Sequence, residues 1–145
     1  MLHFVVEHNT ILIVFILQSP YYIDGDFKLT QSLAILRYLA DKHGLLGKTA
    51  EERAKVSMLE QQLMDFRNGM SRVGYDAELF ESRKDGFLKG LPDTVALLAK
   101  FLGDKQFAIG SELTYVDFLF YEQLVFIRAV FAEAYQPKAA LFDVY

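Results

Sequence analysis

The sequence predicts an α+β fold, in which a β-hairpin and one helix precede a part made only of helices. Two short β-prone runs, 21–23 and 27–29, flank Asp24-Gly25-Asp26, and an Asp-Gly step in that setting is a strong hairpin signal. Beyond residue 51 the apolar residues recur every three or four positions, as on one face of a helix. A chain of 145 residues is long enough to bury such a core.

The first helix is expected over 31–43, directly after the second strand. Leu33, Leu36 and Ala40 fall on one of its faces, and Gly44 stands where a left-handed residue would end it. A strand, a tight turn, a second strand and a helix together form the end of an α/β layer.

The start of this helix carries polar residues that suit ligand binding. Gln31 and Ser32 open the helix, where unpaired backbone N–H groups and the helix dipole favour a carboxylate or a phosphate. The Gln31 amide and the Ser32 hydroxyl also suit the zwitterionic end of an amino acid. The alternative is that Thr30 or Ser32 only caps the helix.

The second part begins with a long helix from residue 51. Gly74 is expected to end it, because glycine weakens a helix interior. Spacings of three and four predict a continuous apolar seam that packs on another helix or another subunit. The seam consists of Val56, Leu59, Leu63, Phe66, Met70 and Val73.

Two further helices are expected. One covers 87–102, with Pro92 kinking it or lying in its first turn and Gly103 ending it. The other follows Thr114, where Thr114 and Asp117 have the spacing of a capping box. We expect Thr114 to accept a hydrogen bond from the Asp117 N–H, while the Asp117 carboxylate accepts one from the Thr114 N–H. Asp117 therefore has a structural task and is a poor candidate for catalysis.

The composition excludes several functions. The net charge is −4 and no Lys/Arg cluster occurs, so we expect no nucleic acid partner. The chain has no Cys, and its three His residues lack metal-ligand spacing, which argues against a metal site. The apolar run 11–17 is too short to span a bilayer. We expect it to be a buried strand; a targeting or interfacial segment and a non-native start are the alternatives.

The sequence resembles the mu-class glutathione S-transferases, including the flatworm type. The resemblance rests on PYYIDGD from Pro20, LTQSLAILRYLADKHG from Leu29, MDFR from Met64 and TYVDFLFY from Thr114. It implies that 1–46 is the remnant of a thioredoxin-like glutathione-binding domain, with 1–18 as a divergent apolar start. Residues 47–145 would be the all-α C-terminal domain, incomplete at its end, so that the chain is truncated at both ends.

The resemblance also implies a glutathione site. Pro20 matches the family's cis-proline, and Ser19 before it would offer backbone groups to the cysteinyl part of glutathione. Gln31 and Ser32 match the pair that holds the γ-glutamyl carboxylate and amine. Asp65 matches the acid that reaches toward the γ-glutamyl ammonium in the partner subunit.

The implied function is conjugation of reduced glutathione to electrophilic xenobiotic or lipid-derived substrates. Tyr75 matches the tyrosine of the electrophile site, but the family's catalytic tyrosine strand has no counterpart, so no catalytic residue is assigned. Glutathione would be a co-substrate, with no cofactor, and the partners would be small hydrophobic electrophiles and a second subunit, in a homodimer or a heterodimer with full-length subunits. A cytoplasmic location is expected, with no membrane partner.

Two other functions stay open at this point. Because the tyrosine strand is absent, the chain could be a non-catalytic fragment that binds glutathione or a hydrophobic ligand. Alternatively, it is a helical interaction module that uses the seam over 56–73.

Overall fold

The computed structural model describes residues 19–74 and 77–130. The chain divides into two compact units, with the boundary between Gly44 and Leu45. The apolar run 11–17, expected to be a strand, lies outside the described residues.

The first unit opens with the predicted hairpin. Strand β1 (Tyr21–Asp24) pairs antiparallel with β2 (Phe27–Thr30), and Asp24 lies opposite Phe27. The loop therefore has two residues, of which the first, Gly25, has a φ of 61°. A glycine adopts that conformation without steric cost, and a positive φ at this position matches the twist of a tight hairpin. The hairpin prediction is confirmed.

Helix α2 (Ser32–Lys42) follows β2 and ends where the sequence predicts. Gly44 has a φ of 69°. The His43 N–H donates to the Leu39 carbonyl at 3.0 Å, and the Gly44 N–H donates to the Asp41 carbonyl at 3.2 Å. These bonds satisfy carbonyls that the end of a helix would otherwise leave unpaired.

Aromatic stacking and one ion pair hold α2 on the hairpin. The ring of Tyr38 stacks on Phe27, with 4.7 Å between centroids, and lies 5.7 Å from the ring of Tyr22. Lys42 Nζ lies 2.5 Å from Asp24 Oδ2. The hydrogen bond and the charge of Lys42 hold the pKa of Asp24 below its ordinary value.

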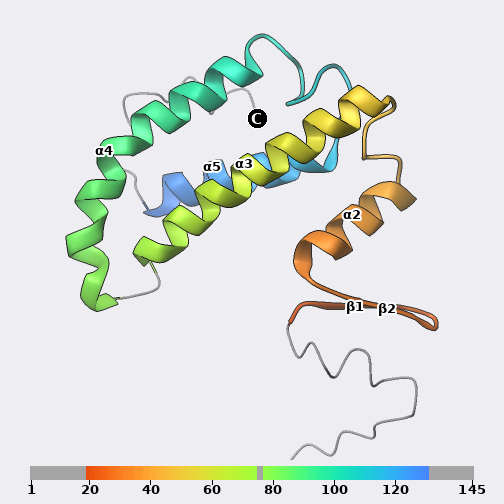
Figure 1. Ribbon diagram of the computed structural model, residues 1–145, viewed down its shortest axis with the longest axis horizontal. Helices are drawn as coiled ribbons and strands as arrows, with labels where there is room; N and C mark the ends of the chain where they lie inside the picture. The colour runs from red at the N-terminus through yellow and green to blue at the C-terminus, as the bar shows by residue number, and fades with distance from the viewer. Residues whose placement is uncertain (1–18, 75–76, 131–145) are drawn as a thin grey trace, which may run out of the picture. The chain divides into compact units, whose positions relative to one another are not determined.

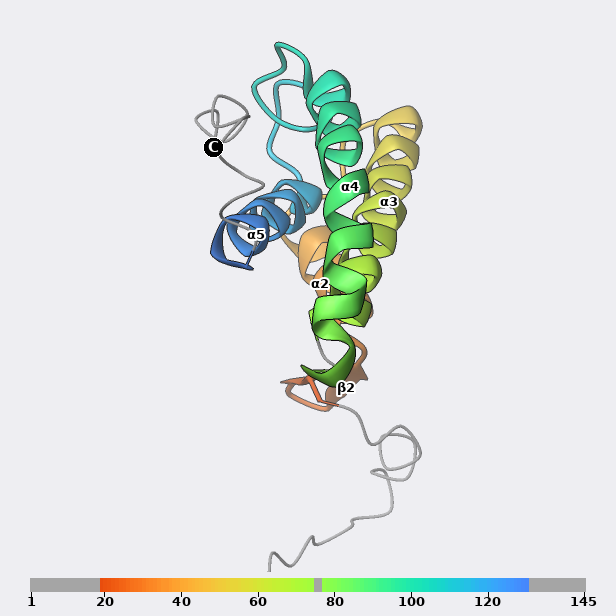
Figure 2. The ribbon, with the colours of Figure 1, turned by 90° about the vertical axis from the view of Figure 1, so that its left-hand side faces the viewer.

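The second unit is built around α3 (Ala50–Gly74), the long helix that the sequence predicts. All six seam residues are buried, and Gly74 is the last residue of the helix. Glu60 is buried as well, with 0% of its surface exposed, although its charge predicts a solvated position. Helix α3 packs against the two helices that follow it, and Figure 2 shows α4 running alongside α3.

Helix α4 (Ala77–Leu102) begins ten residues before the predicted start at 87. Pro92 therefore lies inside the helix and not in its first turn. Figure 1 shows that α4 changes direction about its middle. Pro92 explains a bend there, because its ring clashes with the preceding turn and it has no N–H to donate. Gly103, with a φ of 55°, follows the last helical residue as predicted.

Helix α5 (Tyr115–Val130) follows Thr114 as predicted. It completes a core cluster that combines side chains from all three long helices. The members of the cluster are Phe66 and Met70 of α3, Leu91 and Val95 of α4, and Ile127 of α5. The order of a two-stranded sheet, one helix and an all-helical unit confirms the predicted α+β class.

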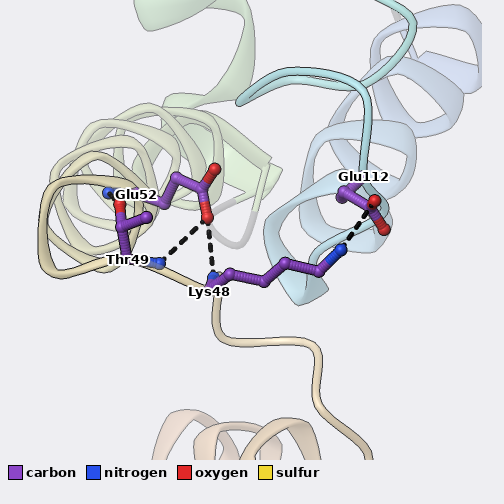
Figure 3. A network of polar contacts seen from close by, with 4 residues as sticks. All are labelled: Lys48, Thr49, Glu52 and Glu112. Carbon is purple, nitrogen blue, oxygen red and sulfur yellow. Dashed lines mark hydrogen bonds and ion pairs between the residues drawn. The ribbon is translucent and has the colours of Figure 1, made fainter.

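A polar network at the start of α3 was not predicted (Figure 3). Thr49 Oγ1 accepts the Glu52 N–H, and Glu52 Oε2 accepts the N–H groups of Thr49 at 3.1 Å and Lys48 at 2.7 Å. These two bonds hold the pKa of Glu52 below its ordinary value. Lys48 Nζ also lies 2.8 Å from Glu112 Oε1, in the segment before α5. The sequence signal was present, since Thr49 and Glu52 have capping-box spacing.

Candidate functional site

The backbone of Gln31 is the most unusual feature of the first unit. Gln31 is the only non-glycine among the described residues with a positive φ, at 73°, and its ψ is 115°. Such a conformation costs a non-glycine residue about 1–3 kcal/mol and is concentrated at functional sites. Gln31 occupies the N-cap position of α2, and its side chain makes no capping hydrogen bond. Neither Thr30 nor Ser32 holds the cap position, so the capping alternative is wrong.

The start of α2 presents backbone donors and a positive dipole end. The first helical bond runs from the Ile35 N–H to the Gln31 carbonyl at 2.9 Å. The N–H groups of the first turn precede that bond and therefore have no intrahelical partner. Gln31 and Ser32 are exposed, and the first turn has no acidic residue. An anion bound at this end would meet no like charge from the helix itself.

Ser19 and Pro20 lie at the same end of the hairpin as Gln31. Tyr21 is paired with Thr30, so the residue before Tyr21 and the residue after Thr30 emerge from the sheet together. The Ser19–Pro20 peptide bond is cis. The hairpin register thus gathers four of the predicted site residues, because Ser32 directly follows Gln31.

The other predicted site residues do not belong to this unit. Asp65 lies in the second unit, where its side chain is exposed on α3. Tyr75 lies outside the described residues, directly after Gly74.

Sequence reasoning missed a pocket of about 300 Å³ between α3, α4 and α5. Arg67 and Glu122 form an ion pair of 3.7 Å in its wall. Gln123 also lines the pocket, is 3% exposed, and its Oε1 has no hydrogen-bond partner among the described residues. A signal was present, since Gln123 falls in the run of buried α5 positions Val116, Phe120, Gln123 and Ile127.

Asp117 holds the start of α5 through both carboxylate oxygens. Oδ2 accepts the Thr114 N–H and the Thr114 hydroxyl, each at 2.9 Å, and Oδ1 accepts the Ala108 N–H at 2.7 Å. The Asp117 N–H donates to the Thr114 carbonyl oxygen at 3.2 Å. The Asp117 carboxylate accepts the Thr114 N–H as the sequence predicts, and the Thr114 hydroxyl donates to the same carboxylate.

The described ranges offer neither a grouped metal site nor a membrane-spanning helix. Within 19–74 and 77–130, no three His, Asp or Glu side chains are grouped so that they could hold a metal ion. No helix in that part of the chain combines the length and the apolar character needed to cross a bilayer.

Comparison with known proteins supports the resemblance on which these expectations rest. The family model described as "Glutathione S-transferase, C-terminal domain" matches residues 64–145, and the N-terminal domain model of the same family matches 6–41. A class-mu 26 kDa glutathione S-transferase of Fasciola hepatica is 54% identical over 109 residues, which is 75% of this chain and 49% of the relative. Glutathione S-transferase Mu 1 of Bos taurus is 52% identical over 105 residues, 72% of this chain and 48% of the relative.

Comparison with solved structures indicates the same family. The crystal structure of the glutathione S-transferase Blo t 8 superposes with a TM-score of 0.79 at 32% identity, covering 93% of this chain and 67% of that one. The chain spans about half the length of the curated relatives it matches. The C-terminal domain model alone matches more than half of the sequence, and the chain therefore belongs to the glutathione S-transferase family.

Proposed function

We propose that this chain carries part of the glutathione site of a cytoplasmic transferase that conjugates reduced glutathione to small hydrophobic electrophiles. The observation that carries the proposal is the strained backbone of Gln31 at the start of α2. Local sequence does not require that strain, since a glycine or an ordinary N-cap residue would open the helix at lower cost. A binding role accounts for it.

The γ-glutamyl end of glutathione would lie on the first turn of α2. Its carboxylate would accept hydrogen bonds from the first-turn N–H groups and from the Ser32 hydroxyl, and the Gln31 amide would bind the same end. The backbone of Ser19 lies at the same end of the hairpin. It would pair with the cysteinyl part of the peptide, while Pro20 fixes the direction of the chain there.

Replacing Gln31 by glycine changes stability and glutathione affinity in opposite directions, so the backbone strain and the binding role of Gln31 can be measured separately. We expect Gln31→Gly to raise the free energy of unfolding by about 0.5–1 kcal/mol, because glycine tolerates the positive φ. We expect the affinity for glutathione to fall about tenfold, because the amide is lost. Urea denaturation and isothermal titration calorimetry with glutathione measure the two effects.

The matched control is Asp41→Ala, an exposed change near the other end of α2, which should leave glutathione affinity unchanged. If calorimetry of the unaltered chain with millimolar glutathione shows no heat of binding, the proposal is contradicted. Equal affinities of the Gln31→Gly variant and the unaltered chain would do the same.

The pocket between α3, α4 and α5 is the proposed place for the electrophile. Met70, Phe80 and Phe126 give it an apolar wall, and Gly74 lines it directly before Tyr75. An apolar pocket with a few polar groups is the usual form of a small-molecule site. We propose that Tyr75 contributes its hydroxyl to this site.

A separate groove of about 320 Å³ between α3 and α4 is the proposed contact with a second subunit. Met58 and Leu97 line it, with 55% and 69% of their surfaces exposed. Exposed apolar groups that cluster in this way mark interaction surfaces. Gln62 lines the same groove, and Asp65 follows it by one helical turn. Asp65 would therefore face a partner seated there, consistent with a role toward the partner's glutathione.

Leu97→Glu should keep the chain monomeric, because it places a charge in the centre of the proposed contact. Sedimentation velocity at tens of micromolar should show a dimer for the unaltered chain and a monomer for the variant. Val125→Glu, which alters another exposed apolar residue on α5, should leave the dimer intact. A monomeric unaltered chain at that concentration would rule out a stable dimer.

A further inference from the structure

We propose that Met58 is a site of oxidation, where hydrogen peroxide or an organic hydroperoxide forms a sulfoxide that weakens the contact with a second subunit. The role of the groove between α3 and α4 as that contact rests on the proposed function. The selectivity for Met58 rests only on how far each methionine of α3 is exposed.

Met58 carries the most accessible sulfur in the part of the chain that the structure describes. The chain has four Met and no Cys, so an oxidant of sulfur meets only thioethers. Three of the four lie on α3: Met58 is 55% exposed, Met64 is half-buried and Met70 is 3% exposed. The sulfur and the terminal methyl carry most of the surface of a methionine side chain, so the exposed part of Met58 includes them. Oxidation follows exposure, and Met58 should therefore react first.

The oxidation needs only the thioether and a peroxide. The Met58 sulfur attacks the terminal oxygen of the peroxide, so that the O–O bond breaks and an S–O bond forms. The sulfur is oxidised by two electrons, which reduce the peroxide. The proton on the transferred oxygen passes to the leaving oxygen, which departs as water or as an alcohol. The product is a polar sulfoxide, and methionine sulfoxide reductases convert it back to the thioether.

The surroundings of Met58 are mainly apolar, so a polar product is poorly accommodated there. Leu97, which is 69% exposed, lines the groove together with Met58 and Phe101. Gln62 and Thr94 also line it, and no charged side chain does so among the described residues. A sulfoxide oxygen that loses its water when a second subunit covers the groove opposes the assembly. In a two-fold symmetric dimer each subunit contributes the same surface, so both copies of Met58 weaken the contact.

Peroxide treatment followed by sedimentation velocity tests the proposal on the full chain. After brief exposure to hydrogen peroxide, stopped with catalase, peptide mass spectrometry should find one added oxygen on Met58 before any on Met70. We expect the dissociation constant of the dimer to rise at least about tenfold, because two polar groups lose water in the contact. Methionine sulfoxide reductases should restore the original value. The samples contain no glutathione.

Met58→Leu should abolish the response to peroxide, because leucine keeps an apolar side chain of similar volume without a sulfur. The readout is the ratio of the dissociation constants after and before treatment, which should be close to one. Met64→Leu removes the half-buried methionine of the same helix and should keep the rise of about tenfold. Met58→Gln introduces a polar side chain of similar length and should raise the dissociation constant without any peroxide.

A dimer that keeps its dissociation constant after Met58 is oxidised would overturn the inference, as would a rise that persists in Met58→Leu. Oxidation of Met70 before Met58 would overturn it too. These outcomes leave the proposed subunit contact standing. A chain that is already monomeric without peroxide contradicts that contact and the inference built on it. Calorimetry with glutathione reports on the proposed glutathione site separately.

Discussion

Asp117→Ala is expected to lower the free energy of unfolding by about 3–4 kcal/mol, because it leaves three buried donors without an acceptor. These donors are the N–H groups of Ala108 and Thr114 and the Thr114 hydroxyl. Ala108, Thr114 and Asp117 are each at most 3% exposed, so water cannot readily replace the carboxylate. One side chain therefore fixes both the start of α5 and the segment that precedes it.

The size of this effect sets it apart from ordinary capping, which contributes about 0.5–2 kcal/mol. A domain of this size has a total stability of about 5–15 kcal/mol, so a substantial part of it depends on Asp117. Urea denaturation followed by far-UV circular dichroism measures the loss. Asp117→Asn retains one carbonyl oxygen and should lose about half as much.

Asp93→Ala is the matched control, since Asp93 is an exposed acid on α4. It should change the free energy of unfolding by no more than about 0.5 kcal/mol. If Asp117→Ala behaved like this control, the network around Asp117 would have no energetic role.

The parts of the fold that sequence alone predicts are those where the local signals agree. The Asp24-Gly25 step, the apolar seam of α3 and the glycines at 44 and 103 each combine a residue preference with the right spacing. The first half of α4 was not predicted to be helical, because its local signals disagree. Gly86 and Gly90 weaken its helical signal, and packing against α3 overrides that weak propensity.

The burial of Glu60 and of Gln123 was not predicted, for a physical reason. A glutamate or glutamine within a helix is usually solvated, and its burial depends on partners that are distant in sequence. Glu60 is buried and accepts a hydrogen bond from Tyr115, which lies 55 positions later in the sequence. Gln123 is buried with an acceptor that no described residue satisfies. The helical spacing marks Gln123 as a buried position, but nothing near either residue in the sequence indicates which groups surround its side chain.

The candidate site was predicted from the chemistry of the helix start and from a resemblance, and the structure adds a feature that neither included. Gln31 and Ser32 were predicted from their place at the start of a helix and then from the matching motifs, whereas the positive φ of Gln31 became visible only in three dimensions. Backbone strain has no sequence signature at a glutamine, because the preference of the residue itself is for ordinary φ values. The strain gives the site a physical argument that is independent of family resemblance.

The second large effect is expected at the contact between Glu60 and Tyr115. The Tyr115 hydroxyl donates to Glu60 Oε2, linking the interior of α3 to the first turn of α5. Both side chains are almost fully buried, at 0% and 2% exposure. Tyr115→Phe should lower the free energy of unfolding by about 2 kcal/mol, because a buried carboxylate oxygen loses a donor. Tyr121→Phe, at an exposed hydroxyl on the same helix, should cost less than about 0.5 kcal/mol.

A double-mutant cycle separates the contact from the packing of its two partners. Glu60→Met should also destabilise the chain, because it leaves the Tyr115 hydroxyl buried without its acceptor. The combination of Glu60→Met with Tyr115→Phe removes donor and acceptor together, leaving an apolar pair that can pack. We therefore expect the double variant to lose at least about 1 kcal/mol less than the sum of the two single losses. Losses that add within about 0.3 kcal/mol would mean that Glu60 is held in the core by its other neighbours and not by Tyr115.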